Sequence, residues 1–350
     1  MILKQILIIK SDELRNLVLA VPSFRMMRKT FPNSRISLLV DSKLISLIEK
    51  CPYIDECIGF DQSKRHQLRY ILSSAQQLRN RKFDLSIDLQ NTWRTHLLAF
   101  LAAIPRRFGY KRRIAGFLLT DSVEFDEAAI TNVNPVQHQF EVLKRCGVIE
   151  FDDALELWTK PEDEISISQK FEEAGINSSQ LIGLVIATDS RWTNKRWPIE
   201  QFLELSKLLI KNFNCQIILL GRREDQELGE VFDRSNLERV FNLIGKTTLP
   251  QLVALIKRLD VLITTDAVSL HIASACGTRT VSLFGPTDSK WNILPPSVHI
   301  SLSKHLPCQP CRSPVCSNPQ QFLCMREIEV DEVCKAVEKQ LEFAGDSVIR

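Results

Sequence analysis

Residues 260–288 carry polar side chains in a pattern that suits anion chemistry. Asp266 falls in a turn after a short β-branched apolar run, and Ser269 and His271 lie in a helical pattern that begins at about Ser269 and ends at Gly277. A strand followed by a helix places them at the carboxyl end of the strand and the amino end of the helix. Ligands of open α/β sheets bind there, and the unpaired N–H groups of a first helical turn favour anions. The pattern predicts an anion site, although a lone His271 is also compatible with a core histidine bonded to a carbonyl.

Alternating strand and helix patterns position these residues and predict an α/β protein with parallel sheets. A charged, turn-rich stretch at 156–168 predicts a linker, so we expect domains at 1–165 and 166–328, with a terminal amphipathic helix over 329–350. No G-x-G-x-x-G occurs, which argues against an ordinary dinucleotide oxidoreductase. The expected strands include 6–9, 36–40, 83–89, 182–187, 215–220 and 261–264; the expected helices include 17–30 and 199–212.

Composition narrows the class of protein further. The 350 residues are 44% hydrophobic and 25% charged, as in soluble globular proteins. A net charge of +3 is too small to indicate nucleic-acid binding, but it is compatible with an acidic substrate or an anionic lipid surface. No apolar run is long enough to span a bilayer, and the first residues resemble a strand more than a signal peptide. We therefore expect a cytoplasmic protein whose ten cysteines are mostly reduced.

Several segments together resemble the family 9 glycosyltransferases, the bacterial lipopolysaccharide heptosyltransferases. The resemblance covers nearly the whole chain and implies an α/β fold of GT-B type, in which two Rossmann-like domains face each other across a cleft. It also implies that the terminal helix crosses back to the N-terminal domain. The segments that carry the resemblance are 84–95, 105–110, Lys195-Arg196-Trp197-Pro198, 245–249, 266–278 and Phe284-Gly285-Pro286-Thr287-Asp288.

The resemblance implies a nucleotide-sugar donor site in the C-terminal half. Lys195 and Ser190 would contact the donor diphosphate, since a lysine can neutralise phosphate as a mobile point charge. Asp225 would bind the ribose hydroxyls, and Thr247 would lie beside the adenine. The remaining donor positions are Asp266, Ala267, Val268 and His271. Where the family has Thr-Gly this chain has Ala267-Val268, and Asp189 replaces a common glycine, so the diphosphate has less room and an added negative neighbour.

The resemblance places the family's glycine and catalytic aspartate on Arg15 and Asn16. Arginine is more restricted in its backbone angles than glycine, and the Asn16 amide cannot act as a general base at neutral pH. Asp12 and Glu13 are nearby carboxylates that could take over this role, although both are equally compatible with solvated loop acids. A candidate catalytic set of Asp12, Glu13 and Asn16 follows.

Basic residues in the N-terminal half are the candidates for acceptor binding. Arg94 lies in a segment like the family's D-L-x-I-D-L-Q-G-x-x-R-S, in which Asn91 replaces the glycine. Arg112 belongs to the basic run 111–113, which precedes the apolar residues 117–119. Such a cluster can rest on an anionic membrane or hold a phosphorylated lipid head group, but a solvated loop also fits.

Four cysteines lie close together near the C-terminus: Cys308, Cys311, Cys316 and Cys324. Many members of the family carry the same pattern. Thiolates suit tetrahedral zinc, so a structural zinc is one interpretation; free thiols and disulfides are the others.

These observations predict an inverting, metal-independent glycosyltransferase that requires no cofactor apart from a possible structural zinc. The resemblance implies transfer of a heptose from ADP-heptose to the lipid-linked inner core of lipopolysaccharide. Its place would be the cytoplasmic face of the inner membrane, as a peripheral protein without a nucleic-acid partner. The departures at Arg15, Asn16, Asp189 and Val268 leave an alternative, a catalytically weakened member that serves as a nucleotide-sugar-binding or scaffold protein.

Overall fold

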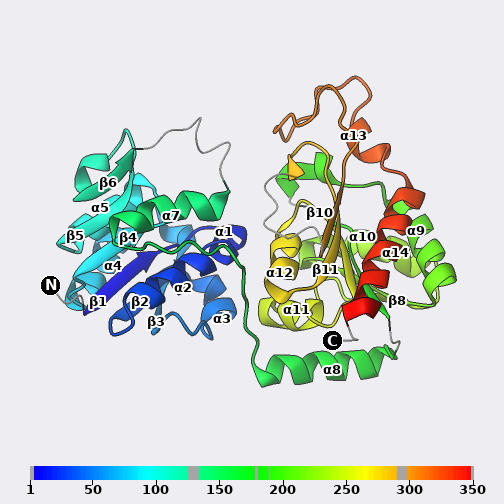
Figure 1. Cartoon of the computed structure of the whole chain (residues 1–350), viewed down its shortest axis with the longest axis horizontal. Helices are drawn as coiled ribbons and strands as arrows, with labels where there is room; N and C mark the ends of the chain where they lie inside the picture. Colours follow the sequence, from blue (N-terminus) through cyan, green and yellow to red (C-terminus); the bar gives the residue numbers. More distant parts are fainter. Residues whose placement is uncertain (1–3, 125–133, 178–179, 189, 290–297, 348–350) are drawn as a thin grey trace. The chain divides into compact units, whose positions relative to one another are not determined.

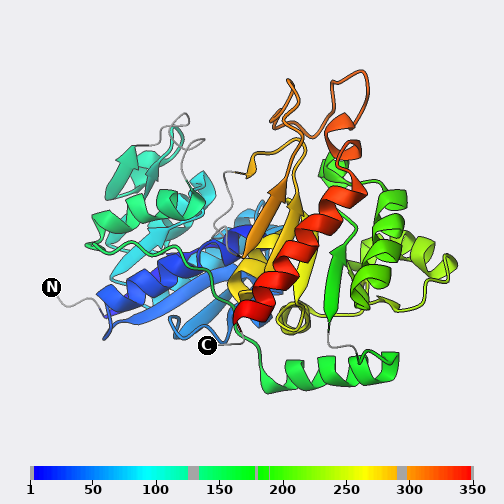
Figure 2. The ribbon, with the colours of Figure 1, turned by 45° about the vertical axis from the view of Figure 1, so that its right-hand side comes forward.

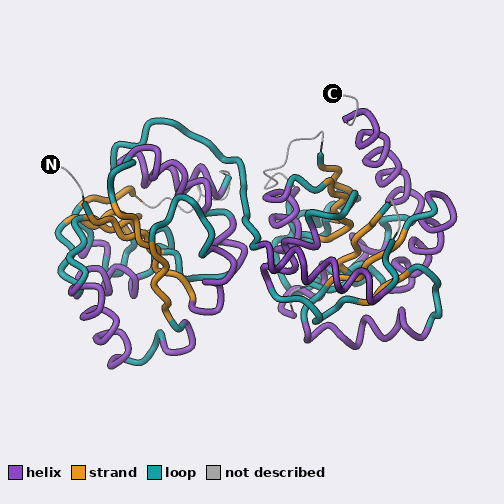
Figure 3. The backbone as a smooth tube through the Cα atoms, turned by 90° about the horizontal axis from the view of Figure 1, so that it is seen from below, coloured by secondary structure: helices purple, strands orange, loops and turns teal. Residues whose placement is uncertain are grey.

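A computed structural model describes residues 4–124, 134–177, 180–188, 190–289 and 298–347. The chain divides into two compact units, Met1–Trp158 and Thr159–Arg350 (Figure 1). Each unit contains one parallel six-stranded sheet with helices on both faces (Figure 3). Among the described residues, no helix is long and apolar enough to cross a membrane.

The first unit has the strand order β3-β2-β1-β4-β5-β6, and every neighbouring pair is parallel. Residues 6–9 of β1 are completely buried, as expected for a parallel strand that helices cover on both faces. The strand order reverses between β1 and β4, and ligands of doubly wound folds bind at such a switch point. The strands are β1 Gln5–Ile9, β2 Arg35–Asp41, β3 Glu56–Phe60, β4 Leu85–Asp88, β5 Arg106–Lys111 and β6 Asp121–Glu124.

The helices of the first unit follow the predicted alternation with one difference. The expected helix 17–30 is divided into α1 and α2. Pro22 lies in the first turn of α2, where a backbone N–H has no partner within the helix, so the missing N–H of proline costs no hydrogen bond. The helices are α1 Leu14–Val18, α2 Val21–Thr30, η1 Ser42–Leu44, α3 Ile45–Ile48, η2 Gln62–Lys64, α4 Leu68–Asn80, α5 Trp93–Leu101, η3 Gly116–Leu118 and α7 Pro135–Arg145.

The second unit has the order β12-β11-β10-β7-β8-β9, again entirely parallel. When the strands of this unit are numbered from β7 as the first, their order in the sheet is the same as in the first unit. The switch point of the second sheet lies between β7 and β10. The strands are β7 Leu181–Val185, β8 Gln216–Leu220, β9 Val240–Asn242, β10 Val261–Thr265, β11 Arg279–Leu283 and β12 His299–Leu302.

Helices cover the second sheet on both faces, and the predicted stop of the helix after β10 is correct. Gly277 ends α12 in the left-handed conformation, at φ +71°. The helices are α8 Pro161–Ala174, η4 Ser190–Lys195, α9 Ile199–Phe213, η5 Arg223–Asp225, α10 Gln226–Arg234, α11 Leu249–Ile256, α12 Val268–Cys276, α13 Leu323–Arg326 and α14 Val330–Ser347.

The boundary between the units lies at 158/159 instead of the expected 165/166. Much of the expected linker 156–168 is helix α8, which begins at Pro161, ends at Gly175 and packs on α11 of the second unit. Helix α14 lies beside β11 and α9 (Figure 2). Its side chains Val333 and Val337 are fully buried. The expected return of 329–350 to the N-terminal domain stays a prediction.

Candidate active site

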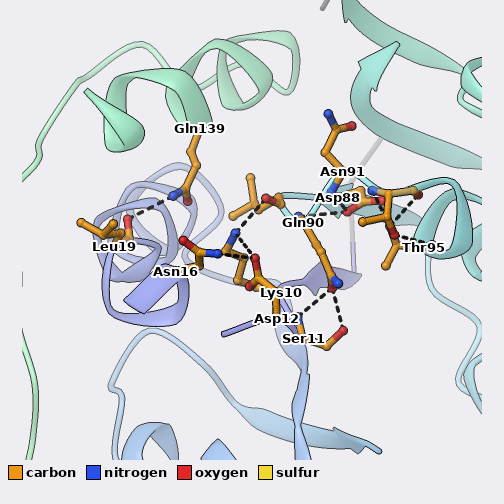
Figure 4. A network of polar contacts seen from close by, with 12 residues as sticks. Lys10, Ser11, Asp12, Asn16, Leu19, Asp88, Gln90, Asn91, Thr95 and Gln139 are labelled. Atoms are coloured by element: carbon orange, nitrogen blue, oxygen red, sulfur yellow. Dashed lines mark hydrogen bonds and ion pairs between the residues drawn. The ribbon is translucent and has the colours of Figure 1, made fainter. Parts of the chain in front are cut away.

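Asp12 lies at the centre of a polar network at the switch point of the first unit (Figure 4). Its Oδ2 accepts from Lys10 Nζ at 3.2 Å and from Asn16 Nδ2 at 2.8 Å. Lys10 also donates to the carbonyl of Leu89, just after β4, and thereby links the two strands that flank the switch point. Asp12 Oδ1 is buried without a hydrogen-bond partner in the described part of the chain. An unsatisfied carboxylate oxygen in such a place is suited to accept a hydroxyl proton.

The other two candidate catalytic residues occupy different environments. Asn16 lies in α1 and donates to Asp12, so its amide orients the carboxylate. Glu13 precedes α1 with an exposed side chain. Arg15 lies inside α1 and does not have positive φ, so this position does not require glycine. The tighter backbone limits of arginine therefore have no consequence at Arg15.

Asn91, at the second lost glycine, does adopt the left-handed conformation, at φ +59°. Asparagine tolerates this region better than most residues. Its Oδ1 accepts from Tyr110 N at 3.0 Å and lies 3.1 Å from His96 Nε2, so the side chain joins the end of β4 to β5 and α5. Asp88 caps the same turn through bonds from Asn91 N and Gln90 N. Burial raises the pKa of the Asp88 carboxyl, and the nearby His96 ring opposes this shift.

The two predicted acceptor-binding arginines lie at different distances from the Asp12 network. Arg112 Nε donates to the carbonyl of Asn91 at 3.2 Å and is therefore part of the switch point. Arg94 instead contacts His66 Nδ1 at 2.9 Å and stacks on the Trp93 ring at 4.5 Å.

Sequence reasoning missed Lys10 and His138 as members of this site. Burial, together with the charges of Lys10 and Arg112, lowers the pKa of His138 to about 4. The ring stacks on Tyr110 with centroids 4.0 Å apart. Lys10 follows β1 directly, which is a usable signal, whereas His138 comes from α7 and reaches the site only through tertiary packing. Two cations near a neutral imidazole make this edge attractive to anionic groups.

In the second unit, Lys195 and Asp266 meet at the switch point. Lys195 comes from the segment after β7 and Asp266 from the turn after β10, and Nζ lies 2.6 Å from Oδ2. Both side chains are about nine-tenths buried, at 9% and 10% exposure. The ammonium also lies 4.4 Å from the centre of the Trp192 ring. A cation held by an aromatic face and one carboxylate can exchange that carboxylate for phosphate oxygens.

The start of α12 has the geometry expected of an anion-binding helix end. Ala267 is its N-cap and offers no side-chain acceptor, so no side-chain cap occupies the N–H groups of the first turn. Val268 is the first helical residue. Ser269 Oγ pairs with Thr264 Oγ1 at 2.7 Å and so faces β10. His271 is buried on the same helix, at 3% exposure.

The other predicted donor residues lie on loops after β7, β8 and β9. Asp225 is buried, and its Oδ2 accepts from Arg222 N at 3.0 Å and Arg222 Nε at 3.4 Å. Thr247 is partly buried and follows Gly245, where an added Cβ would lie 2.9 Å from the Cα of Arg223. Ser190 begins η4, but its side chain, like all of Asp189, lies outside the described residues. The donor roles of these residues stay predictions.

The four C-terminal cysteines line one pocket together with Asn194 and Gln309. All are free thiols, so the disulfide interpretation is wrong. Burial raises the pKa of Cys324 to about 11, and the other three sulfurs add to the shift. Within the described residues, no group of three or more His, Cys, Asp or Glu is arranged to hold a metal ion. The zinc interpretation therefore does not fit this arrangement of thiols.

The segment 284–288 anchors this cysteine loop. Gln309 Nε2 donates to the Gly285 carbonyl at 2.8 Å, and a Cβ on Gly285 would lie 2.6 Å from Met325 Sδ. Asn194, next to Lys195, donates to the carbonyl of Ser313 at 2.8 Å. The loop thus supports the segment that carries the lysine.

The family model of glycosyltransferase family 9 (heptosyltransferase) matches residues 71–321, which is most of the chain. The chain belongs to this family. The lipopolysaccharide heptosyltransferase 2 of Salmonella typhimurium is 26% identical over 313 residues, covering 84% of this chain and 86% of that protein.

Two solved structures show the fold. The family 9 glycosyltransferase from Veillonella parvula has a TM-score of 0.84 at 22% identity and covers 97% of both chains. The Escherichia coli ADP-heptose lipopolysaccharide heptosyltransferase II has a TM-score of 0.76 at 20% identity, covering 97% of this chain and 99% of that one. The prediction of an α/β fold of GT-B type with two Rossmann-like domains is confirmed.

Proposed function

We propose that this protein transfers a heptose from ADP-heptose to the inner core of lipopolysaccharide, in an inverting reaction that needs neither a metal nor another cofactor. The observation that carries the proposal is the Lys195 ammonium, held at a switch point by Asp266 and Trp192. Membership of a heptosyltransferase family and the substrates in the names of its relatives support the choice of donor and acceptor.

In this proposal the second unit binds the donor. Lys195, Ser190 and the first N–H groups of α12 neutralise the diphosphate as it leaves, an electrostatic effect that is strongest when the donors are preorganised. When the donor binds, phosphate oxygens take the place of the Asp266 carboxylate beside the Lys195 ammonium, and the ion pair between the two residues weakens. Ala267, Val268 and His271 shape the site around the sugar, and Asp225 and Thr247 take the ribose and adenine.

The first unit supplies the base and the acceptor contacts. The acceptor hydroxyl oxygen forms the new bond to the anomeric carbon while the bond to the ADP oxygen breaks. Asp12 takes the hydroxyl proton, and Asn16 and Lys10 hold its carboxylate in place. Arg112 and Arg94 bind anionic groups of the acceptor. Glu13 is the alternative base, although its exposed position suits the role less well than that of Asp12.

A direct test combines the purified protein with ADP-heptose and a truncated, heptose-accepting core lipid, with mass spectrometry to detect product. We expect one heptose to be added, with full activity in the presence of a metal chelator. Binding of ADP-heptose without any product would favour the second candidate, a nucleotide-sugar-binding protein, which the replacement of the family's catalytic aspartate by Asn16 motivates. Absence of both binding and product would contradict both candidates.

A structural zinc at Cys308, Cys311, Cys316 and Cys324 would require the thiols to rearrange, and no step above depends on it. Metal analysis of the purified protein decides this point, since stoichiometric zinc would show that the thiols converge when metal is present.

We further propose that the protein acts at the cytoplasmic face of the inner membrane as a peripheral protein, because a lipid-linked acceptor is confined to that surface.

A further inference from the structure

Exposed apolar side chains follow the carboxyl ends of three strands in the first unit. Strands β3, β4 and β5 are parallel members of one sheet, so the segments that leave their carboxyl ends lie at one edge. Phe117 is 85% exposed and Leu68 is 69% exposed. The apolar members of this rim are Leu68, Leu72, Trp93, Ile114 and Phe117.

The exposure of Phe117 is built into the local fold. Ala115, the N-cap of the short helix η3, adopts a left-handed conformation, at φ +67°. A Cβ on Gly116 would lie 2.9 Å from Lys111 Cγ, so this turn packs tightly against β5. Gly116 and Leu118 are buried, and Phe117 between them is directed outward. The fold therefore presents this ring to the surroundings.

The other apolar members are joined by a direct contact between two helix starts. Leu68 and Leu72 lie one turn apart on an exposed face of α4. Arg94 bonds His66, just before α4, and stacks on Trp93, the first residue of α5. The starts of α4 and α5 thus form one continuous surface.

This rim carries positive charge that described acids do not neutralise. Two acids near the rim in sequence are already paired, Asp61 with Lys64 at 3.0 Å and Glu124 with Lys111 at 2.8 Å. Four arginines of the rim form no ion pair with any described residue: Arg65, Arg69, Arg94 and Arg113. Arginines interleaved with exposed aromatic and aliphatic side chains match a bilayer surface of anionic head groups over acyl chains.

We propose that this apolar–basic rim binds an anionic bilayer surface, with Phe117 and Ile114 inserted among the head groups and Arg65, Arg69 and Arg113 on lipid phosphates. The inference rests on the proposed function for its purpose, since the rim borders the sheet edge that carries Asp12 and would bring that edge to a lipid-linked acceptor. A second copy of this chain is the competing occupant, but like-charged rims would repel each other.

The test measures sedimentation of the full-length protein with vesicles of phosphatidylethanolamine mixed with phosphatidylglycerol, and with vesicles of phosphatidylcholine alone. We expect binding to the first only, weakened by salt. Phe117→Ser should reduce the partition coefficient about tenfold. Arg69→Gln combined with Arg113→Gln should reduce it about 25-fold, since each surface arginine contributes about fivefold. Ile149→Ser, at a position 88% exposed outside the rim, is the matched control and should bind like the wild type.

Equal binding to both vesicle types, or wild-type binding by the rim variants, would overturn the proposal. The proposal would also be overturned if the protein does not bind vesicles but forms a dimer in sedimentation velocity that Phe117→Ser dissociates. Circular dichroism establishes that each variant is folded. Heptose transfer to a water-soluble acceptor without lipid should be unchanged in Phe117→Ser. This assay therefore tests the proposed transfer separately from the membrane binding that sedimentation measures.

Discussion

Replacing Lys195 should both destabilise the second unit and weaken ADP binding. Lys195→Met keeps the length of the side chain but leaves the Asp266 carboxylate, which is 10% exposed, without its ammonium. Removing one partner of a buried ion pair costs about 3–5 kcal/mol because the other charge stays desolvated. The loss of a charge-assisted bond to phosphate, about 1.5–3 kcal/mol, corresponds to roughly 10- to 150-fold weaker binding of ADP.

A double-mutant cycle isolates the pair. Asp266→Asn removes the buried charge, so Lys195→Met should cost much less in that background, and the two changes should be strongly non-additive. Urea unfolding together with amide hydrogen exchange in β7 and β10 measures the effect in the second unit. Arg234→Met is the control, because its pair with Glu230 at 2.8 Å is exposed at both ends and should contribute less than about 1 kcal/mol. Additive effects, or a Lys195→Met variant as stable as this control, would refute the pairing.

Three further predictions follow from the fold. Asn91→Ala should lower the free energy of unfolding by about 2–3 kcal/mol, because it leaves Tyr110 N without its acceptor and places alanine at φ +59°. Asn91→Gly should cost less, since glycine adopts positive φ without strain. Equal losses for the two variants in urea unfolding would contradict this backbone explanation. Burial lowers the pKa of His299 to about 4, from an ordinary value of 6.5, so the unfolded chain binds this proton first and stability should fall by up to about 3 kcal/mol as pH drops from 6.5 to 4. His299→Gln should make stability depend less on pH between 6.5 and 4. An unchanged pH dependence in this variant would show that His299 is not its cause. Gly285→Ala should lower the free energy of unfolding by about 1–3 kcal/mol, because the new methyl group overlaps Met325. A melting temperature equal to that of the wild type would show that the loop accommodates the methyl group.

The fold was predictable, and so was the gathering of the candidate residues beyond the strand ends, because both depend on local patterns. Buried β-branched runs such as 6–9 and 261–264 identify parallel strands, and doubly wound order places ligands beyond their carboxyl ends. The helix over 161–174 also had local signals, namely Pro161 at its start, acids in its first turn and Gly175 at its end. Sequence reasoning interpreted these charges as a linker, and this error moved the domain boundary.

Side-chain pairings across long sequence separations could not be predicted in the same way. Lys195 and Asp266 were both candidate donor residues, but their direct contact depends on how β7 and β10 pair in space. The glycine replacements at Arg15 and Asn91 also looked alike in the sequence. Only coordinates distinguish Arg15, in an ordinary helix, from Asn91, which needs the left-handed region.

The most direct measurement of the central claim is the rate of heptose transfer by Asp12→Asn under saturating donor. This variant keeps the shape of the side chain but cannot accept a proton at neutral pH. We predict that kcat falls at least about 100-fold, the usual contribution of a general base, while the Kd for ADP is unchanged. Transfer at the wild-type rate by Asp12→Asn would contradict the assignment of Asp12 as the base that replaces the family's aspartate.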